Sequence, residues 1–351
     1  MDMFKPKAST RQPAIGELRA IPGHPVPPGA ICARLGTEDG VVIRSARWPQ
    51  SPHMPCRGTV AVLPGRAEFI EKYYEVITEL TMRGFCVAML DWRGQGGSER
   101  LLANPHAGYV DDFTHYQRDF SAFLSQVLRP HCPYPHYALS HSMGGAILME
   151  ALQTHYRDAE RVVMVAPMLG LALGRYEGVA RFTARVGHLL GLGSALIPGG
   201  DDTPVNLRPF EPNRVTSDPR RFAVARDIIK ANPELGIGAP TLGWLDAAFA
   251  CMERITAPQA LRDLRQPLLM VAGSGDRVVS NRVIEHVSAR LIAGGHLTIP
   301  TAKHEVMMEQ DPLRAQFWAI FDAFIPPSAL PASSVTPGEG HDPIAAQRMA
   351  L

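Results

Sequence analysis

The sequence predicts an α/β fold with a mostly parallel central sheet and helices on both of its faces. Short apolar runs, typical of buried strands, alternate with longer segments of helical periodicity. Strands that alternate with helices join into a parallel sheet, because each helix carries the chain back to the edge where the next strand starts. The length of 351 residues fits one such domain with an insertion.

The expected elements begin after an irregular, proline-rich extension at residues 1–29. A strand pair follows at 30–49, with Asp39 and Gly40 as its hairpin turn. Further strands are expected near residues 58–64, 85–91, 137–142, 161–167, 267–273 and 296–300, with helices between most of them. A low-complexity tail at 327–351 is expected to be disordered.

The interval between the strand that ends at Pro167 and the one that starts at Pro267 is too long for a plain crossover helix. We therefore expect an inserted helical cap at residues 168–262. The cap divides the core into a first part at 30–167 and a second part at 263–326.

A candidate nucleophile lies in the segment YALSHSMGGAIL, which joins an apolar strand to a helix that opens on glycines. Ser142 stands at the corner, where a sharp turn would hold its hydroxyl clear of the sheet and within reach of a base. Gly144 and Gly145 leave room for this turn and for close packing of the helix. Ser140 takes the place of the first glycine in the Gly-x-Ser-x-Gly pattern, so the motif alone is of moderate specificity.

Two further strand ends present an acid and a base. The run PLLMVAGSGD ends in a glycine-rich loop with Asp276, and the loop TAKHE after the strand HLTIP places His304 before the final helix. His304 can act as a general base, and Asp276 can orient its ring. The chain order Ser142, Asp276, His304 is the order found in α/β-hydrolases.

Other titratable residues near these motifs are expected to have structural roles. His141 should pack against the turn and position it, with its side chain directed away from Ser142. Glu305 and Glu309 should cap or solvate the first turns of the final helix. Asp263 is a weaker rival to Asp276, because no glycine-rich loop presents it.

A serine hydrolase also needs two backbone N–H groups that bind the oxyanion of the tetrahedral intermediate. The amide of Met143, directly after Ser142, is one candidate. The other is the amide of Arg66, because Pro64 and Gly65 form a tight turn at the end of the strand GTVAVLP.

Composition excludes several other functions. A net charge of +1 gives no sign of nucleic-acid binding, and five scattered cysteines without CxxC spacing indicate neither a disulfide framework nor a metal site. No cofactor is expected. The N-terminus lacks the apolar region of a signal peptide, and the apolar run at 162–174 is shorter than the ~18 residues of a membrane-spanning helix. We expect a cytoplasmic protein, with peripheral contact at the inner membrane left open.

The order of these motifs resembles the lysophospholipase and monoacylglycerol lipase branch of the α/β-hydrolases, in the serine aminopeptidase-like family. The resemblance rests on Gly65-Arg66, FIEKYYE, the run Asp91-Trp92-Arg93-Gly94-Gln95-Gly96, HSMGGAI and His304-Glu305, and extends over most of residues 57–325. Many members have His where this chain has Pro64, and Gly where it has Ser140; both replacements look like bacterial lysophospholipases.

The resemblance implies that the chain hydrolyses the ester of a monoacyl lipid, a lysophospholipid or a monoacylglycerol. A small-ester carboxylesterase and a serine aminopeptidase remain alternatives on the same scaffold. A non-catalytic hydrolase-like binding protein is disfavoured by the intact set Ser142, Asp276 and His304. The sequence does not specify the head group, the acyl length or the oligomeric state.

Two apolar stripes at helical spacing lie in the expected cap. They comprise Val179, Phe182, Val186, Leu189 and Leu190, and then Leu245, Ala248, Phe249 and Met252. We expect most of them to pack onto the core, although a fatty-acyl substrate would also need an apolar groove. Arg175, Arg181 and Arg185 flank the first stripe, either as a solvated face or as contacts for anionic lipid head groups.

Overall fold

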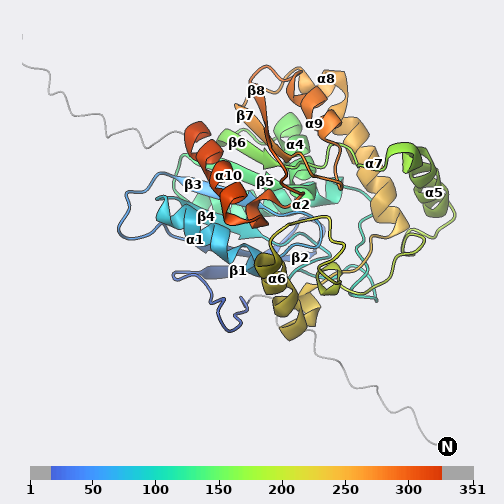
Figure 1. Ribbon diagram of the computed structural model, residues 1–351, viewed down its shortest axis with the longest axis horizontal. Helices are drawn as coiled ribbons and strands as arrows, with labels where there is room; N and C mark the ends of the chain where they lie inside the picture. Colours follow the sequence, from blue (N-terminus) through green and yellow to red (C-terminus); the bar gives the residue numbers. More distant parts are fainter. Residues whose placement is uncertain (1–16, 326–351) are drawn as a thin grey trace, which may run out of the picture.

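The computed structural model describes residues 17–325 (Figure 1). Part of the expected N-terminal extension at 1–29, and the whole of the expected tail at 327–351, lie outside the described residues. The described part of the extension lies against the core. The indole of Trp48 donates a hydrogen bond of 3.2 Å to the carbonyl of Pro27, and the hydroxyl of Tyr74 donates one of 2.9 Å to the carbonyl of Arg19.

The described chain contains one eight-stranded sheet in the order β1-β2-β4-β3-β5-β6-β7-β8. Its strands are β1 (Ile31–Gly36), β2 (Val42–Trp48), β3 (Thr59–Leu63), β4 (Cys86–Leu90), β5 (His136–His141), β6 (Ala159–Val165), β7 (Leu268–Gly273) and β8 (Gly294–Ile299). β2 is antiparallel to both of its neighbours, β1 and β4, and all other pairs are parallel. The predicted fold class and the predicted strands are therefore correct.

The hairpin between β1 and β2 is the predicted one. Gly40 has a φ of 85°, in the left-handed region that favours glycine, and lies in the turn expected at Asp39 and Gly40. Strands β3 to β8 are parallel, so their carboxyl ends meet at one edge of the sheet, where the candidate residues are concentrated.

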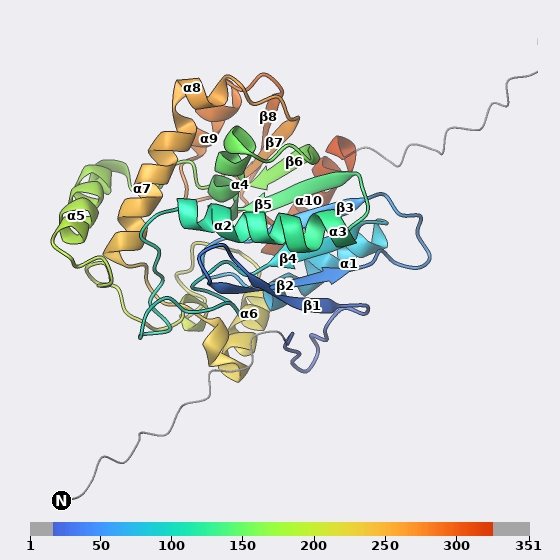
Figure 2. The same cartoon turned by 180° about the vertical axis from the view of Figure 1, so that it is seen from behind.

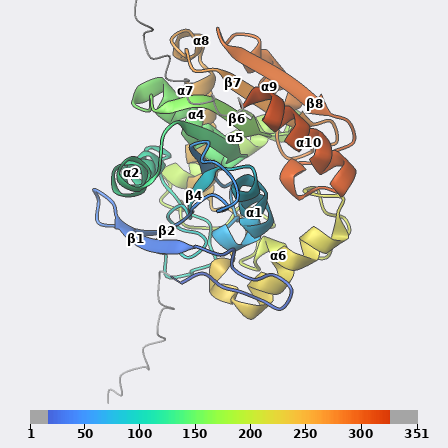
Figure 3. The ribbon, with the colours of Figure 1, turned by 90° about the vertical axis from the view of Figure 1, so that its left-hand side faces the viewer.

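Helices cover both faces of the sheet. The core helices are α1 (Tyr74–Met82), α2 (Thr114–Phe123), α4 (Met143–Thr154), α9 (Asn281–Ser288) and α10 (Asp311–Phe324). A π-helical turn (Leu124–Leu128) joins α2 to the short α3 (Arg129–His131). With the molecule turned by 90°, α1 and α10 lie on one side of the sheet and α2 and α4 on the other (Figure 3).

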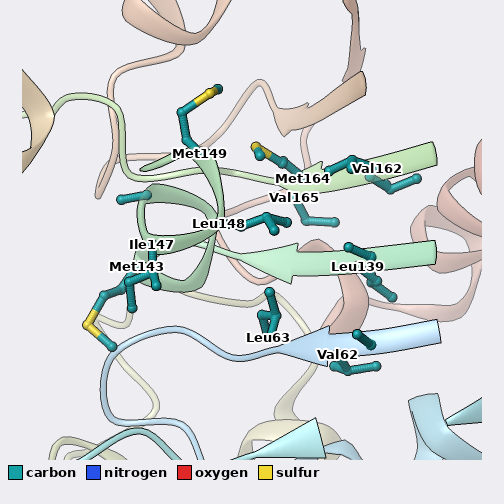
Figure 4. Packing of buried hydrophobic residues seen from close by; sticks show 14 of the residues in the cluster. Val62, Leu63, Leu139, Met143, Ile147, Leu148, Met149, Val162, Met164 and Val165 are labelled. Carbon is teal, nitrogen blue, oxygen red and sulfur yellow. The ribbon is translucent and has the colours of Figure 1, made fainter. Parts of the chain in front are cut away.

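The core forms where the central strands meet α4. Every residue of β3, β4, β5 and β7 is buried, as expected of strands covered on both faces. Figure 4 shows Leu148 of α4 directed towards the strands, near Val165 of β6 and Leu63 of β3. This packing fixes the first turn of α4 against the end of β5, which is where Ser142 lies.

Four helices stand between β6 and β7, at the place where the sequence predicts an insertion. They are α5 (Glu177–Leu189), α6 (Pro219–Ala231), α7 (Leu242–Thr256) and α8 (Pro258–Leu261). Asp218 caps α6 by accepting hydrogen bonds from the backbone N–H groups of Arg220 and Arg221, and Thr241 caps α7 in the same way. Seen from behind, α5 packs along α7 at the margin of the molecule (Figure 2).

The expectation that most residues of the two apolar stripes pack onto the core is wrong for the first stripe. Val179, Phe182, Leu189 and Leu190 are each at least 65% exposed, whereas Ala248, Phe249 and Met252 of α7 are buried. The physical reason is that α5 turns its small residues towards α7. Ala184 and Gly187 are buried there, and a Cβ on Gly187 would lie 2.6 Å from Leu242 Cδ1. The close approach of the two helices leaves the large apolar side chains of α5 on the outside.

No helix among the described residues is long and apolar enough to cross a membrane.

Candidate active site

Ser142 lies at the corner between β5 and α4, in a strained backbone conformation. Its φ of 49° and ψ of −116° are rare for a residue with a Cβ. Two glycines, at the second and third positions after Ser142, make the corner possible. A Cβ on Gly144 would lie 2.3 Å from the carbonyl oxygen of Leu63, and one on Gly145 would lie 2.7 Å from Pro167 Cβ. The turn therefore presents the Ser142 hydroxyl at the carboxyl end of the sheet.

The structure brings Ser142, His304 and Asp276 into one hydrogen-bonded chain. The Nδ1–H of His304 donates to Asp276 Oδ2 over 2.7 Å, which leaves Nε2 as the acceptor for the hydroxyl of Ser142 at 2.9 Å. The side chain of Asp276 is fully buried and that of His304 nearly so. This is the relative arrangement of a nucleophile, a general base and a carboxylate that orients the base.

The loops after β7 and β8 are bonded to one another, which holds the acid and the base in register. The N–H of Gly275 donates to the carbonyl of Ala302 at 2.8 Å, and the N–H of Thr301 donates to Ser274 Oγ at 2.8 Å. Only glycine fits at position 273, because a Cβ there would lie 2.2 Å from the carbonyl oxygen of Ala302.

Asp276 is held as a carboxylate. Its Oδ1 accepts hydrogen bonds from the N–H groups of Val278 at 2.7 Å and Val279 at 3.1 Å. Burial raises the pKa of Asp276, but the hydrogen bond and charge of His304, together with these two amides, lower it by more. The net pKa lies below the ordinary value, so Asp276 is ionised at neutral pH and can hold the ring of His304.

The turn after β3 lies directly beside Ser142. A Cβ on Gly65 would lie 3.1 Å from Ser142 Cβ. Neither the N–H of Arg66 nor that of Met143 has a hydrogen-bond partner among residues 17–325. Gln95 braces this turn, since its Nε2 donates to the carbonyl of Gly65 at 2.8 Å. Two free amides beside a serine hydroxyl are what an oxyanion hole requires.

A buried carboxylate, Glu68, joins this turn to the rest of the site. Its oxygens accept hydrogen bonds from the N–H of Gly65 at 2.5 Å, the hydroxyl of Tyr73 at 2.7 Å, the ring of His141 at 2.9 Å and the amine of Lys72 at 3.0 Å. Burial raises the pKa of Glu68, but the charges of His141 and Lys72 lower it well below its ordinary value. Glu68 is therefore an anion that holds the turn closed.

His141 makes its hydrogen bonds to Glu68 and, through Nε2 at 3.2 Å, to the carbonyl oxygen of His304. It makes none to Ser142 among the described residues. His141 thus connects the turn at Glu68 to the loop that carries His304.

The side chain of Ser140 is buried, and its Oγ has no hydrogen-bond partner within the described chain.

The expectation that Glu305 and Glu309 cap or solvate the final helix is wrong. Glu305 pairs with Lys72 at 2.6 Å, and Glu309 is fully buried. Glu309 accepts hydrogen bonds from the N–H of Lys303 at 2.8 Å and the N–H of Ser217 at 2.9 Å. It therefore ties the loop of His304 to the inserted segment, while α10 begins only at Asp311.

Sequence reasoning missed Glu68, Lys72 and Gln95. Glu68 and Lys72 are four residues apart, a spacing typical of exposed ion pairs on a helix, so the spacing gave no signal of burial. Gln95 belongs to the run at residues 91–96 that supports the family resemblance. Nothing in that run indicates its hydrogen bond to Gly65, because the two residues are 30 positions apart in the chain.

Within the described residues no group of His, Cys, Asp and Glu side chains is placed to hold a metal ion. The chemistry that the arrangement can perform is acyl transfer, in which a serine hydroxyl attacks a carbonyl and a histidine moves the proton.

Comparisons with known proteins agree with this geometry. The sequence profile of the family described as "Serine aminopeptidase, S33" matches residues 54–311. Lysophospholipase L2 of Escherichia coli (strain K12) is 31% identical over 303 residues, which cover 82% of this chain and 85% of that protein. Probable lysophospholipase L2 of Haemophilus influenzae is 26% identical over 264 residues, which cover 75% of this chain and 82% of that protein.

A solved structure shows the same fold. A soluble variant of monoglyceride lipase from Saccharomyces cerevisiae, in complex with a substrate analog, superposes with a TM-score of 0.68 at 16% identity. The match covers 93% of this chain and all of that one.

Proposed function

Since the chain belongs to the serine aminopeptidase S33 family of α/β-hydrolases, we propose that it cleaves the carboxylic ester of a monoacyl lipid. The chain is an enzyme of the type that includes lysophospholipases and monoglyceride lipases, and it acts as a carboxylic ester hydrolase. The observation that carries the proposal is the hydrogen-bonded chain from Ser142 through His304 to Asp276.

The reaction proceeds in two halves. Ser142 Oγ attacks the ester carbonyl carbon while His304 Nε2 takes the hydroxyl proton, and Asp276 stabilises the imidazolium that forms. The tetrahedral intermediate collapses, the carbon–oxygen bond to the alcohol breaks, and His304 gives its proton to the departing alcohol. Water then attacks the acyl carbonyl carbon while His304 Nε2 takes its proton. The bond between that carbon and Ser142 Oγ breaks, His304 returns the proton to Ser142 Oγ, and the fatty acid leaves.

The amides of Met143 and Arg66 bind the oxyanion in both halves of this reaction. Support comes from their lack of other partners in the described chain and from the closeness of Gly65 to Ser142. Preorganised amides lower the barrier most when they are already fixed, since no reorganisation is needed as charge develops. The bonds of Gln95 and Glu68 to Gly65 fix the turn in this way.

A lysophospholipid is the preferred substrate class, and a monoacylglycerol is the second. The Escherichia coli relative with 31% identity is named a lysophospholipase. The likeness to the yeast monoglyceride lipase, at 16% identity, supports the fold alone.

The enzyme reaches such lipids by peripheral contact through α5. Large apolar side chains are exposed just before this helix, along it and just after it, an arrangement typical of interfacial helices: Tyr176, Val179, Phe182, Leu189, Leu190 and Leu192. We call this set the α5 surface. Beside it lies an apolar hollow of about 240 Å³, between Val179, Ile197 and Leu245. Arg175, which is exposed just before this helix and has no carboxylate partner among the described residues, adds positive charge that favours anionic lipid.

Covalent labelling tests the catalytic proposal. A fluorophosphonate probe should modify the wild-type protein at Ser142, as mapped by mass spectrometry of the labelled peptide, and should not modify the Ser142→Ala variant. Competition with lysophosphatidylcholine and with monoacylglycerol of the same chain length then ranks the two lipid classes. Labelling of a different residue in folded protein would overturn the assignment.

Turnover assays separate the proposal from its alternatives. Preference for p-nitrophenyl acetate over long-chain esters would indicate a small-ester carboxylesterase. Release of p-nitroaniline from prolyl p-nitroanilide, without ester turnover, would indicate an aminopeptidase.

A further inference from the structure

The side chain of Arg66 leaves the turn beside Ser142 and lies against two other segments. Its Nη2 donates a hydrogen bond of 2.6 Å to the carbonyl of Gly238, and its guanidinium carbon lies 5.3 Å from the ring centre of Trp244. Its Nε is buried without a hydrogen-bond partner. A Cβ on Gly108 would lie 2.3 Å from Nη2, so the backbone at that position makes room for the guanidinium.

Arg66 has no carboxylate partner among the described residues. Two other arginines withdrawn from solvent pair with acids: Arg44 with Glu71 and Asp91, and Arg93 with Asp39 and Asp119. Withdrawing a guanidinium from water without a counter-ion is unfavourable. Burial lowers the pKa of Arg66 to about 10, which still leaves it protonated at neutral pH. The cation is kept in place by a carbonyl and a ring, and its charge is not neutralised.

Most of its hydrogen-bonding capacity is also unused. A guanidinium carries five N–H donors, and the described residues accept only one of them, at Gly238. The two N–H groups on Nη1 and the second one on Nη2 remain available to an acceptor outside the described protein groups. Planar pairs of N–H donors match the oxygens of a phosphate in geometry and charge.

The position of the charge selects the part of a substrate that would meet it. The amide and the guanidinium belong to the same residue, so the cation lies within one arginine side chain of the proposed oxyanion hole. In a lysophospholipid, the phosphate lies across the glycerol from the ester that is cleaved, a separation of similar length. We propose that the Arg66 guanidinium binds the phosphate of the lysophospholipid head group. This inference rests on the proposed function and names Arg66 as the residue that favours phosphate-bearing over neutral monoacyl lipids.

The ratio of two specificity constants tests the inference. In mixed micelles, kcat/KM is measured for 1-acyl lysophosphatidylglycerol and for monoacylglycerol with the same acyl chain. In Arg66→Met we expect the phosphate-to-neutral ratio to fall by about 10- to 100-fold, the loss of one or two charge-assisted hydrogen bonds. Arg66→Lys, which keeps a point charge but not the planar donors, should keep part of the preference.

Two further variants control for a structural effect. Gly108→Ala adds a methyl group where Nη2 lies and should lower the same ratio without altering the turn beside Ser142. Arg100→Met is the matched control, because Arg100 is likewise withdrawn from solvent and bonds to a backbone carbonyl, that of Glu234. The ratio should stay at its wild-type value in Arg100→Met.

A soluble probe gives a second measurement. sn-Glycerol 3-phosphate should inhibit hydrolysis of p-nitrophenyl butyrate by the wild-type enzyme more strongly than glycerol does, and this difference should disappear in Arg66→Met. If wild type cleaves both lipids and the ratio is unchanged in folded Arg66→Met and Gly108→Ala, the inference is wrong and Arg66 only ties the turn to the inserted segment. If wild type cleaves neither lipid, the proposed function is wrong, and the inference that rests on it is wrong as well.

Discussion

Glu68 and His141 form a buried pair that connects the turn beside Ser142 to the loop of His304. Glu68 Oε2 lies 2.9 Å from His141 Nδ1, and both side chains are 3% exposed. His141 Nε2 lies 3.2 Å from the carbonyl oxygen of His304. Because both partners are acceptors, both ring nitrogens must carry a proton, and His141 is an imidazolium. Burial lowers the pKa of His141, but the charge of Glu68 raises it by more, so the net pKa lies above the ordinary value.

Replacing Glu68 by Gln should reduce both activity and stability. The change removes the charge that keeps His141 protonated, so the turn and the loop of His304 lose their connection. We expect kcat to fall at least about 10-fold with a smaller change in KM, and the free energy of unfolding to fall by about 3–5 kcal/mol, as for a broken buried pair. Asp158→Asn, which breaks the surface pair with Arg129, is the control and should cost no more than about 1 kcal/mol.

The pH dependence of this loss distinguishes an ion pair from a packing effect. The folded pKa of His141 is raised, so its contribution is complete below its unfolded pKa of about 6.5 and is lost as pH rises through the folded value. The folded pKa of Glu68 is lowered, so its contribution is complete above its unfolded pKa of about 4.3. The difference in Tm between wild type and Glu68→Gln should therefore be largest between about pH 4.3 and 6.5. A difference that is constant from pH 4 to 9 would contradict the ion pair.

The side chain at position 142 should lower the free energy of unfolding, although it is necessary for activity. Ser142→Ala and Ser142→Gly both remove the nucleophile, and each should lower kcat by roughly 10⁴- to 10⁶-fold. At a φ of 49° a Cβ is strained and glycine is not, so Ser142→Gly should be about 1 kcal/mol more stable than Ser142→Ala. Chemical denaturation of the two inactive variants measures this difference directly. A more stable alanine variant would show that the backbone at this corner relaxes.

Asp276→Asn should abolish most activity while the fold remains. An amide at this position can present its N–H to His304 Nδ1, which favours the tautomer that cannot accept the proton of Ser142. We expect kcat to fall by roughly 10⁴-fold at neutral pH. Asp263→Asn, at an exposed acid before β7, should keep wild-type kcat. A mild loss in Asp276→Asn would point to a different orienting acid.

The α5 surface should determine binding to lipid vesicles. Phe182→Ser and Leu189→Ser remove two side chains that are each 70% exposed, so they should weaken sedimentation with anionic vesicles without lowering Tm. Met82→Ser and Ile292→Ser are the matched controls, since they remove side chains that are at least 60% exposed elsewhere on the core. Equal weakening by all four variants would indicate non-specific apolar adhesion.

The sequence alone determined the fold class, the strands and the chain order of Ser142, Asp276 and His304. These features are local: an apolar run followed by a glycine-rich loop defines a strand end, and parallel strands bring their carboxyl ends to one edge. The hairpin at Asp39 and Gly40 was predictable for the same reason, because its turn is set by two adjacent residues.

Only the tertiary structure decided how the site is supported. Glu68 and His141 are 73 residues apart, and Lys72 and Glu305 are 233 apart, so no pattern in either segment indicates the contact. The exposure of the apolar side of α5 was likewise not predictable from the sequence, because helical spacing shows which residues share a face but not whether that face packs against another element. Here α5 packs against α7 through Ala184 and Gly187, because small side chains allow the two helices to approach closely. The large apolar side chains of α5 therefore face outwards.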